Sequence, residues 1–250
     1  MPISRSCLML LSFVLAVPAV SFADDAASRA IIEKAIERNG GEKELARFKA
    51  STSSFKGTFQ LNGTPVSFTG DVAAQGSDQQ RLSISLQVDG QMIAFTSVLN
   101  RDQGWQKVNE NTADMTAEQL TEAKANAYSS WVSTLLPLKD KAFTLAPFGE
   151  IEIGDRKVVG VNVTREGRRS ITLFFDKESL RLVRTETTVR DEMTSKEVTE
   201  EINYTEFKEQ DGIPYATKLV IKRNGQPHLD LEIIQLKPVE KLDDSLFAKP

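Results

Sequence analysis

Residues Arg81–Val88, which read RLSISLQV, have the clearest strand pattern in the chain. Leucine, isoleucine or valine stands at every even position, and serine or glutamine separates them. Because successive side chains of a β-strand point to opposite faces, this alternation predicts a strand with one dry and one wet face. Asp89-Gly90 follows at once, and that dipeptide favours a two-residue hairpin turn with positive φ. The stretch therefore predicts one arm of an antiparallel hairpin.

The same alternation or β-branched enrichment recurs on both sides of this strand. It predicts about ten or eleven antiparallel strands, most of them joined by tight hairpins. The turn signals are Asn62-Gly63, Arg165-Glu166-Gly167, Asp176-Lys177, Asp211-Gly212 and Asn224-Gly225. The other expected strands are Ser54–Leu61, Pro65–Ala73, Met92–Leu99, one near Ile151, Lys157–Val163, Ile171–Phe175, Leu180–Val189, Val198–Phe207, Tyr215–Lys222 and Leu229–Leu236.

Helical periodicity occurs in only two parts of the chain. Asp25 can cap a first helix over Ala26–Arg38, which Asn39-Gly40-Gly41 ends, and a short second piece over Glu42–Phe48 follows. A central helix starts at Thr116 and should stop at Pro137. Its apolar stripe consists of Leu120, Ala123, Ala127, Tyr128, Trp131 and Leu135.

These elements predict a β-rich α+β fold, because so long a meander must curl or close to hide its apolar face. We expect an incomplete, half-open antiparallel β-barrel whose concave face is covered by the N-terminal and central helices. The stripe of the central helix is explained equally by a filled core and by a lid over an apolar cavity. Periodicity does not separate the two, because both bury the same side chains.

The first residues are typical of a secretory signal. Arg5 precedes the apolar run Cys7–Val20, and Ser21-Phe22-Ala23 has the form of a signal peptidase site. The run is shorter than the ~20 apolar residues that span a bilayer. We expect residues 1–23 to be a cleaved signal peptide and residues 24–250 to be a single domain in the periplasm, without cysteine or disulfide.

The composition of the 250-residue chain argues against most catalytic chemistries. It holds one His and one Cys, which leaves no usual zinc or thiolate site, and no cofactor motif occurs. We expect His228 to face solvent on a strand. Paired carboxylates leave a hydrolase as a remote alternative. The net charge of −4 gives no footprint for nucleic acid, and Arg165, Arg168 and Arg169 are expected to form a solvated turn or, alternatively, to dock an acidic partner or a lipid headgroup.

The closing segment Lys241-Leu242-Asp243-Asp244-Ser245-Leu246-Phe247 adds a resemblance. Together with the signal, the first helix ending in Asn-Gly-Gly and the hairpins around a central helix, it resembles the LolA/LolB-like outer-membrane lipoprotein carriers and their periplasmic relatives. The resemblance implies a half-barrel with a helical lid over an apolar cavity that holds acyl chains. It implies no cofactor and no nucleophile.

We therefore expect a non-enzymatic, monomeric periplasmic carrier of lipid or lipoprotein acyl chains, served by a membrane-bound donor or acceptor. The candidate ligand-binding residues are Leu120, Tyr128, Trp131 and Leu135 of the stripe and Ile84 on a strand; no residue is assigned to catalysis or to a metal. The alternative is a periplasmic sensor or scaffold of the same fold that binds a protein partner without transferring lipid.

Overall fold

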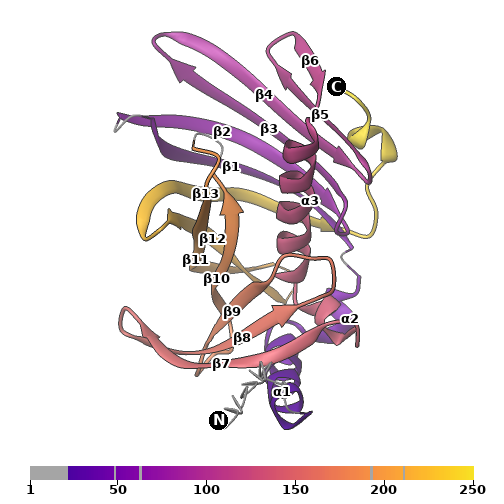
Figure 1. Ribbon diagram of the computed structural model, residues 1–250, viewed down its shortest axis with the longest axis vertical. Helices are drawn as coiled ribbons and strands as arrows, with labels where there is room; N and C mark the ends of the chain where they lie inside the picture. The colour runs from indigo at the N-terminus through magenta and orange to yellow at the C-terminus, as the bar shows by residue number, and fades with distance from the viewer. Residues whose placement is uncertain (1–21, 48, 62–63, 192–193, 211) are drawn as a thin grey trace, which may run out of the picture.

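A single large antiparallel sheet dominates the computed structural model, which describes residues 22–250 except 48, 62–63, 192–193 and 211. Its thirteen strands follow the order β6-β5-β4-β3-β2-β1-β13-β12-β11-β10-β9-β8-β7 (Figure 1). The strands are β1 (Ala50–Leu61), β2 (Thr64–Gln75), β3 (Gln79–Val88), β4 (Gln91–Asn100), β5 (Gln103–Val108), β6 (Asn111–Asp114), β7 (Thr144–Ile153), β8 (Arg156–Thr164), β9 (Ile171–Asp176), β10 (Leu182–Arg190), β11 (Glu197–Gln210), β12 (Ile213–Arg223) and β13 (Gln226–Val239).

The order of the sheet shows how the chain builds it. Strands β1 to β6 form one run of neighbours and β7 to β13 form another, and the pairing of β1 with β13 joins the two runs. β6 and β7 remain unpaired with each other at the two ends, so the sheet is not closed. The predicted half-open antiparallel barrel with helices is therefore confirmed.

Two of the predicted hairpin turns have the expected backbone conformation. Asp89 and Gly90 have φ of 50° and 80°, and Asn224 and Gly225 have φ of 48° and 75°. Positive φ at both central residues matches the right-handed twist of the strands that they join. The Asn62-Gly63 turn, Asp211 and the predicted leader up to residue 21 lie outside the described residues, so cleavage after Ala23 stays a prediction.

Two strands were missed by the sequence prediction. β5 pairs with β4, and β6 pairs with β5, in the segment between the first meander and the central helix. QGWQKV and NTAD carry no regular alternation, and β6 has only four residues at the edge of the sheet. Pairing with β4 makes strands of them where their own sequence gives little signal.

The helices differ from their predicted bounds. α1 spans Phe22–Arg38 and α2 spans Gly41–Leu45, whereas Phe48 lies outside the described residues. α3 spans Ala117–Val132 and begins with the predicted cap, in which the Thr116 side chain accepts a hydrogen bond from the Gln119 N–H. Its predicted end at Pro137 is wrong, because Leu135 has φ of 69° and leads into the 3-10 turn Leu136–Lys139.

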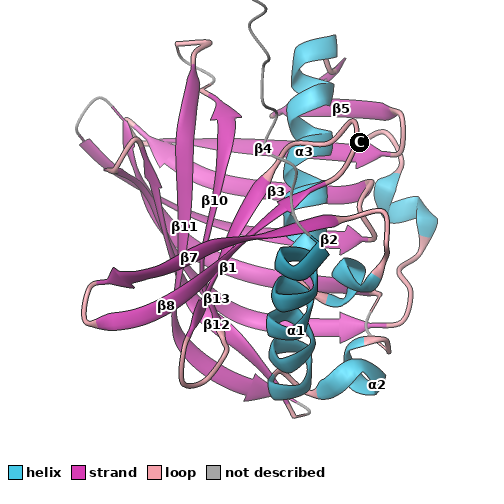
Figure 2. Ribbon diagram, turned by 60° about the horizontal axis from the view of Figure 1, so that its bottom comes forward, coloured by secondary structure: helices cyan, strands magenta, loops and turns pink. Residues whose placement is uncertain are grey.

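The main core lies between the helices and one face of the sheet, which we call the inner face. α1 and α3 lie against this face in Figure 2. The core contains Ile32, Ala35 and Ile36 of α1, Tyr128 and Val132 of α3, Leu135, Leu138 and Phe143 after it, and Leu145, Val161, Val163, Ile171, Leu173 and Phe175 of β7 to β9. The packed core thus occupies the β7–β9 end of the inner face.

The opposite, outer face is crossed by the C-terminal segment with its 3-10 turn Asp244–Phe247. Phe247 is fully buried against Ala73 and Val98, with Leu242 and Trp105 beside it. The closing Ser-Leu-Phe pattern therefore has a structural role in packing the chain end onto β2, β4 and β5.

Candidate functional site

Beyond the packed core, the inner face continues as an apolar surface that is only half-buried. The inner face can be followed across the sheet through residues that pair from one strand to the next. These residues are, in order, Leu173, Thr185, Ile202, Ile221 and Leu229. The half-buried apolar side chains with this orientation are Ile84, Leu86 and Val88 of β3, Ile93 and Phe95 of β4, Leu219 and Ile221 of β12, and Leu229, Leu231 and Ile233 of β13. We call this set the open apolar surface.

Beside this surface, two glycines leave room for aromatic rings on the neighbouring strands. Gly57 and Gly70 stand opposite Phe68 and Phe55 on β1 and β2. A Cβ on Gly70 would lie 2.6 Å from the Phe55 ring, and one on Gly57 would lie 2.6 Å from the Phe68 ring. Each ring therefore lies over the glycine opposite it, and the two rings meet edge to face at 72°, with centroids 6.0 Å apart; both are buried. Side chains at the glycine positions would collide with these rings.

α3 crosses the inner face and has two different halves. Its buried residues are Ala127, Tyr128 and Val132, all in the C-terminal half. The N-terminal half is held by Leu120, whose Cδ1 lies 3.1 Å from the position of a Cβ on Gly104 of β5, and by polar contacts. In Figure 1 the helix runs from β5 toward α1 and α2, so its N-terminal half bridges the part of the face that the core leaves open.

Polar contacts fasten the N-terminal half of α3 on both flanks. On one side Lys124 pairs with Asp102 at 2.6 Å. On the other side Glu122 accepts hydrogen bonds of 2.6 and 3.0 Å from Arg169, at the base of the β8–β9 hairpin tip. Both partners of the second pair are about three-quarters buried, with 21% and 24% of their side chains exposed. A bidentate, partly buried ion pair is stronger than an exposed one. The Glu122–Arg169 pair therefore contributes more than the Lys124–Asp102 pair to holding the N-terminal half of α3.

The arginines of the hairpin tip form the predicted solvated turn only in part, because Arg168 is exposed whereas Arg165 and Arg169 are half-buried. The guanidinium of Arg165 lies 5.0 Å from the ring centroid of Phe143, and that of Arg168 lies 5.4 Å from the ring centroid of Tyr128. The two rings are nearly parallel, at 12°, with centroids 6.4 Å apart. Such cation–π contacts stabilise by about 0.5–1 kcal/mol at exposed sites. The tip therefore packs on α3 and the segment that follows it.

The hydroxyl of Tyr128 is an exception to the rule that buried polar groups are hydrogen-bonded. It is buried, and among the described residues it has no hydrogen-bond partner. Leaving such a group unsatisfied costs about 1–3 kcal/mol. Burial raises the pKa of the Tyr128 phenol, while the charges of Arg165 and Arg168 oppose this shift. The group is thus a neutral donor next to two cations.

The structure brings three of the five predicted site residues together. Tyr128 and Leu135 belong to the packed core, and Trp131 is partly buried against it, with its ring centroid 6.3 Å from that of Tyr128. Leu120 lies at the other end of α3, and Ile84 lies on the open apolar surface of β3. Their binding role stays a prediction.

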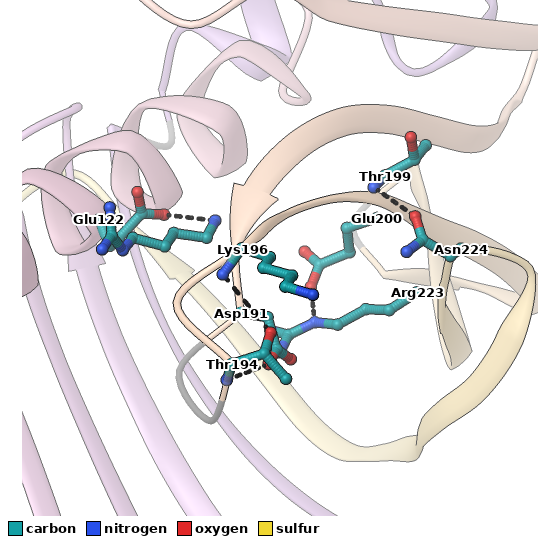
Figure 3. Close-up of polar contacts among 9 residues, drawn as sticks. Glu122, Asp191, Thr194, Lys196, Thr199, Glu200, Arg223 and Asn224 are labelled. Atoms are coloured by element: carbon teal, nitrogen blue, oxygen red, sulfur yellow. Dashed lines mark hydrogen bonds and ion pairs between the residues drawn. The ribbon is translucent and has the colours of Figure 1, made fainter.

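A charged cluster limits the inner face at the ends of β10 to β12. Figure 3 shows Arg223 between two carboxylates: it pairs with Glu200 at 3.0 Å and with Asp191 at 3.3 Å. These side chains are exposed by only 14–19%. Hydrogen bonds from the side chain and N–H of Thr194 and the nearby charge of Arg223 lower the pKa of Asp191. The cluster is a polar border to the open apolar surface.

The outer face offers a different kind of surface. A depression of about 610 Å³ lies over β1 to β4, β12 and β13. Its side chains of outer orientation include Lys56, Thr58, Thr69, Ser85 and Gln87. Its lining also includes Phe68, Leu86, Met92 and Leu231, so this depression combines polar and apolar groups.

Two kinds of feature are absent from the part of the chain that the structure describes. No three His, Cys, Asp or Glu side chains lie close enough to hold a metal ion within those residues. Likewise, none of the helices described here is both long and apolar enough to cross a membrane.

Solved structures with the same architecture are found, although no family model and no curated protein matches the sequence. A putative outer membrane lipoprotein-sorting protein domain from Vibrio parahaemolyticus is 10% identical, with a TM-score of 0.59 over 90% of this chain and 97% of that one. A LolA superfamily protein from Nitrosomonas europaea is 12% identical, with a TM-score of 0.58 over 89% of this chain and 97% of that one. A DUF1329 family protein from Desulfovibrio piger is 10% identical, with a TM-score of 0.58 over 88% of this chain and 97% of that one. The chain therefore has a LolA-like fold.

Proposed function

We propose that this LolA-like chain is a periplasmic carrier that binds the acyl chains of a lipid or lipoprotein on the open apolar surface, beneath the N-terminal half of α3. The observation that carries the proposal is the alternation on β3. Ile84 and Leu86 on the inner face are half-buried and apolar, whereas Ser85 and Gln87 on the outer face are exposed and polar.

The energetics favour an apolar ligand. Moving a chain of about 16 methylenes into water costs on the order of 13 kcal/mol, at ~0.8 kcal/mol per CH₂. A soluble carrier has to recover much of this by apolar contact, and the half-buried aliphatic side chains of the open apolar surface, with Phe95 among them, supply such contact. Because ion pairs and Leu120, not the packed core, hold the N-terminal half of α3, opening this half for a ligand would leave the core contacts of Tyr128 and Val132 in place.

Neighbouring residues on opposite faces of β3 provide the test. Palmitate binding is measured by isothermal titration for the unaltered chain, for Ile84→Glu and for the matched control Ser85→Glu. We expect Ile84→Glu to weaken binding at least tenfold, about 1.4 kcal/mol, because it buries a charge against the chain. Ser85→Glu places the same charge in solvent and should bind as the unaltered chain does.

Folding of both variants is checked by circular dichroism and thermal unfolding, and Ile84→Ala gives a milder change should the charged variant unfold. Equal affinity in all variants would refute the proposal. Failure of the unaltered chain to bind any acyl ligand would do the same, and would favour a sensor or scaffold that binds a protein partner.

A further inference from the structure

We propose that the tip of the β8–β9 hairpin and the hydroxyl of Tyr128 form a binding site for the phosphate group of an amphiphilic cargo. The inference rests on the proposed function, because it names the polar end of the ligand whose acyl chain lies on the open apolar surface. It starts from a buried donor that the fold leaves unused.

The unused donor is the Tyr128 hydroxyl. It is buried without a hydrogen-bond partner among the described residues, in a helix that crosses the inner face. A phenol is both donor and acceptor, and buried phenols normally find a partner. The absence of a protein partner points to a ligand acceptor at this position.

Two guanidinium groups with spare donors lie over the ring of Tyr128 and over the neighbouring ring of Phe143. Arg168 is exposed and lies over the ring of Tyr128, and within the described part of the chain no carboxylate pairs with its guanidinium. Arg165 lies over the neighbouring ring of Phe143, and its contact with Asp140 is long, at 3.8 Å. Arg169 differs from both, because Glu122 already takes two of its donors.

This donor set matches a phosphate group. A phosphate offers several acceptor oxygens and negative charge, and arginine forks bind it in a bidentate manner. Arg165, Arg168 and the Tyr128 hydroxyl together supply five or more donors from two guanidinium groups and one phenol. The open turn at Gly167, with φ of 68°, presents the two arginines from the surface.

The position fits an amphiphile better than a free ion. Trp131, one turn along α3 from Tyr128, is partly buried beside the Phe143 ring, with centroids 6.2 Å apart. Arg169 of the same hairpin tip pairs with Glu122 in the N-terminal half of α3, so an acyl chain attached to a phosphate at the tip can extend along α3 toward the open apolar surface. The headgroup would remain at the surface, where Arg168 is exposed.

The test compares three probes below their micelle concentrations: dodecyl phosphate, dodecanol and inorganic phosphate. Binding is followed by Trp131 fluorescence in a Trp105→Phe background, since Trp105 packs on the outer face. We expect dodecyl phosphate to bind about tenfold to a hundredfold more tightly than dodecanol. Arg168→Gln should remove most of this preference without weakening dodecanol, and Tyr128→Phe should reduce it severalfold.

Arg181 provides the matched control, because its guanidinium also lies over an aromatic ring, that of Phe207 at 5.3 Å, away from α3. Arg181→Gln should keep the full preference for dodecyl phosphate. Equal binding of dodecyl phosphate and dodecanol would overturn the phosphate site and leave the carrier function standing. Binding of neither amphiphile would refute the carrier function itself, and tight binding of inorganic phosphate alone would show a free-phosphate site in place of a cargo site.

Discussion

Replacing Glu122 with glutamine should loosen the N-terminal half of α3 and leave its C-terminal half in place. The carboxylate accepts hydrogen bonds of 2.6 and 3.0 Å from Arg169 and a longer one of 3.4 Å from the Arg190 N–H. The amide keeps one acceptor oxygen and loses the charge. Since hydrogen bonds to charged groups contribute about 1.5–3 kcal/mol, we expect local opening to become roughly tenfold to a hundredfold more frequent.

Hydrogen exchange of backbone amides, followed by mass spectrometry of α3 peptides, measures this opening. Peptides from 118–126 should exchange faster in Glu122→Gln, whereas peptides from 127–132 should not, because Ala127, Tyr128 and Val132 anchor that half in the core. Glu118→Gln is the control, since Glu118 is 72% exposed and its pair with Arg190 is 3.6 Å long. Equal acceleration along the whole helix, or none at all, would refute the two-halves description.

Three further predictions concern the helix anchors and a glycine of the sheet. Desolvation raises the pKa of Asp25, but hydrogen bonds from Arg29 and the Leu145 N–H outweigh it, so the pKa is lowered. The ionised Asp25 therefore stabilises the folded chain above pH ~3.9, and this contribution is lost as the pH falls through the folded pKa. In chemical denaturation, Asp25→Asn should be less stable than the unaltered chain at pH 7 and equally stable in strong acid. Gly70→Ala would place a Cβ 2.4 Å from a backbone oxygen and 2.6 Å from the Phe55 ring, so its thermal midpoint should fall by several degrees. Ser85→Ala, at an exposed position of the neighbouring strand β3, is the reference substitution and should leave the midpoint unchanged. Tyr128→Phe removes an unsatisfied hydroxyl and should leave the thermal midpoint unchanged or raised; a clear fall would show that a bound water satisfies the group.

The sequence predicted the elements whose signals are local. The period of two in Arg81–Val88 and the Asp89-Gly90 turn depend on neighbouring residues, and the structure confirms both. The start of α3 depends on Thr116 and Gln119, which form the capping box. The predicted end of α3 was wrong because Leu135 has a positive φ, a conformation that sequence reasoning expects of glycine or asparagine and not of leucine.

Contacts between distant segments could not be predicted in this way. The Arg165-Glu166-Gly167 turn has the composition of a solvated tip, and only the folded chain shows its arginines over rings that precede it by more than twenty residues. Likewise, nothing local in NTAD marks an edge strand. For the site, periodicity identified the α3 stripe, but the division between a core-bound half and a bridging half follows from the position of the sheet.

Photo-crosslinking with a palmitate that carries a diazirine at its chain end would locate the acyl chain and so test whether it binds on the open apolar surface. We expect the mapped adducts to fall on inner-face residues of the open apolar surface, such as Ile84, Ile93 and Phe95, and on α3 near Leu120. Adducts on outer-face residues of the depression, such as Thr58, Ser85 and Gln87, or adducts scattered over both faces of the sheet, would show that the acyl chain does not lie on the inner face.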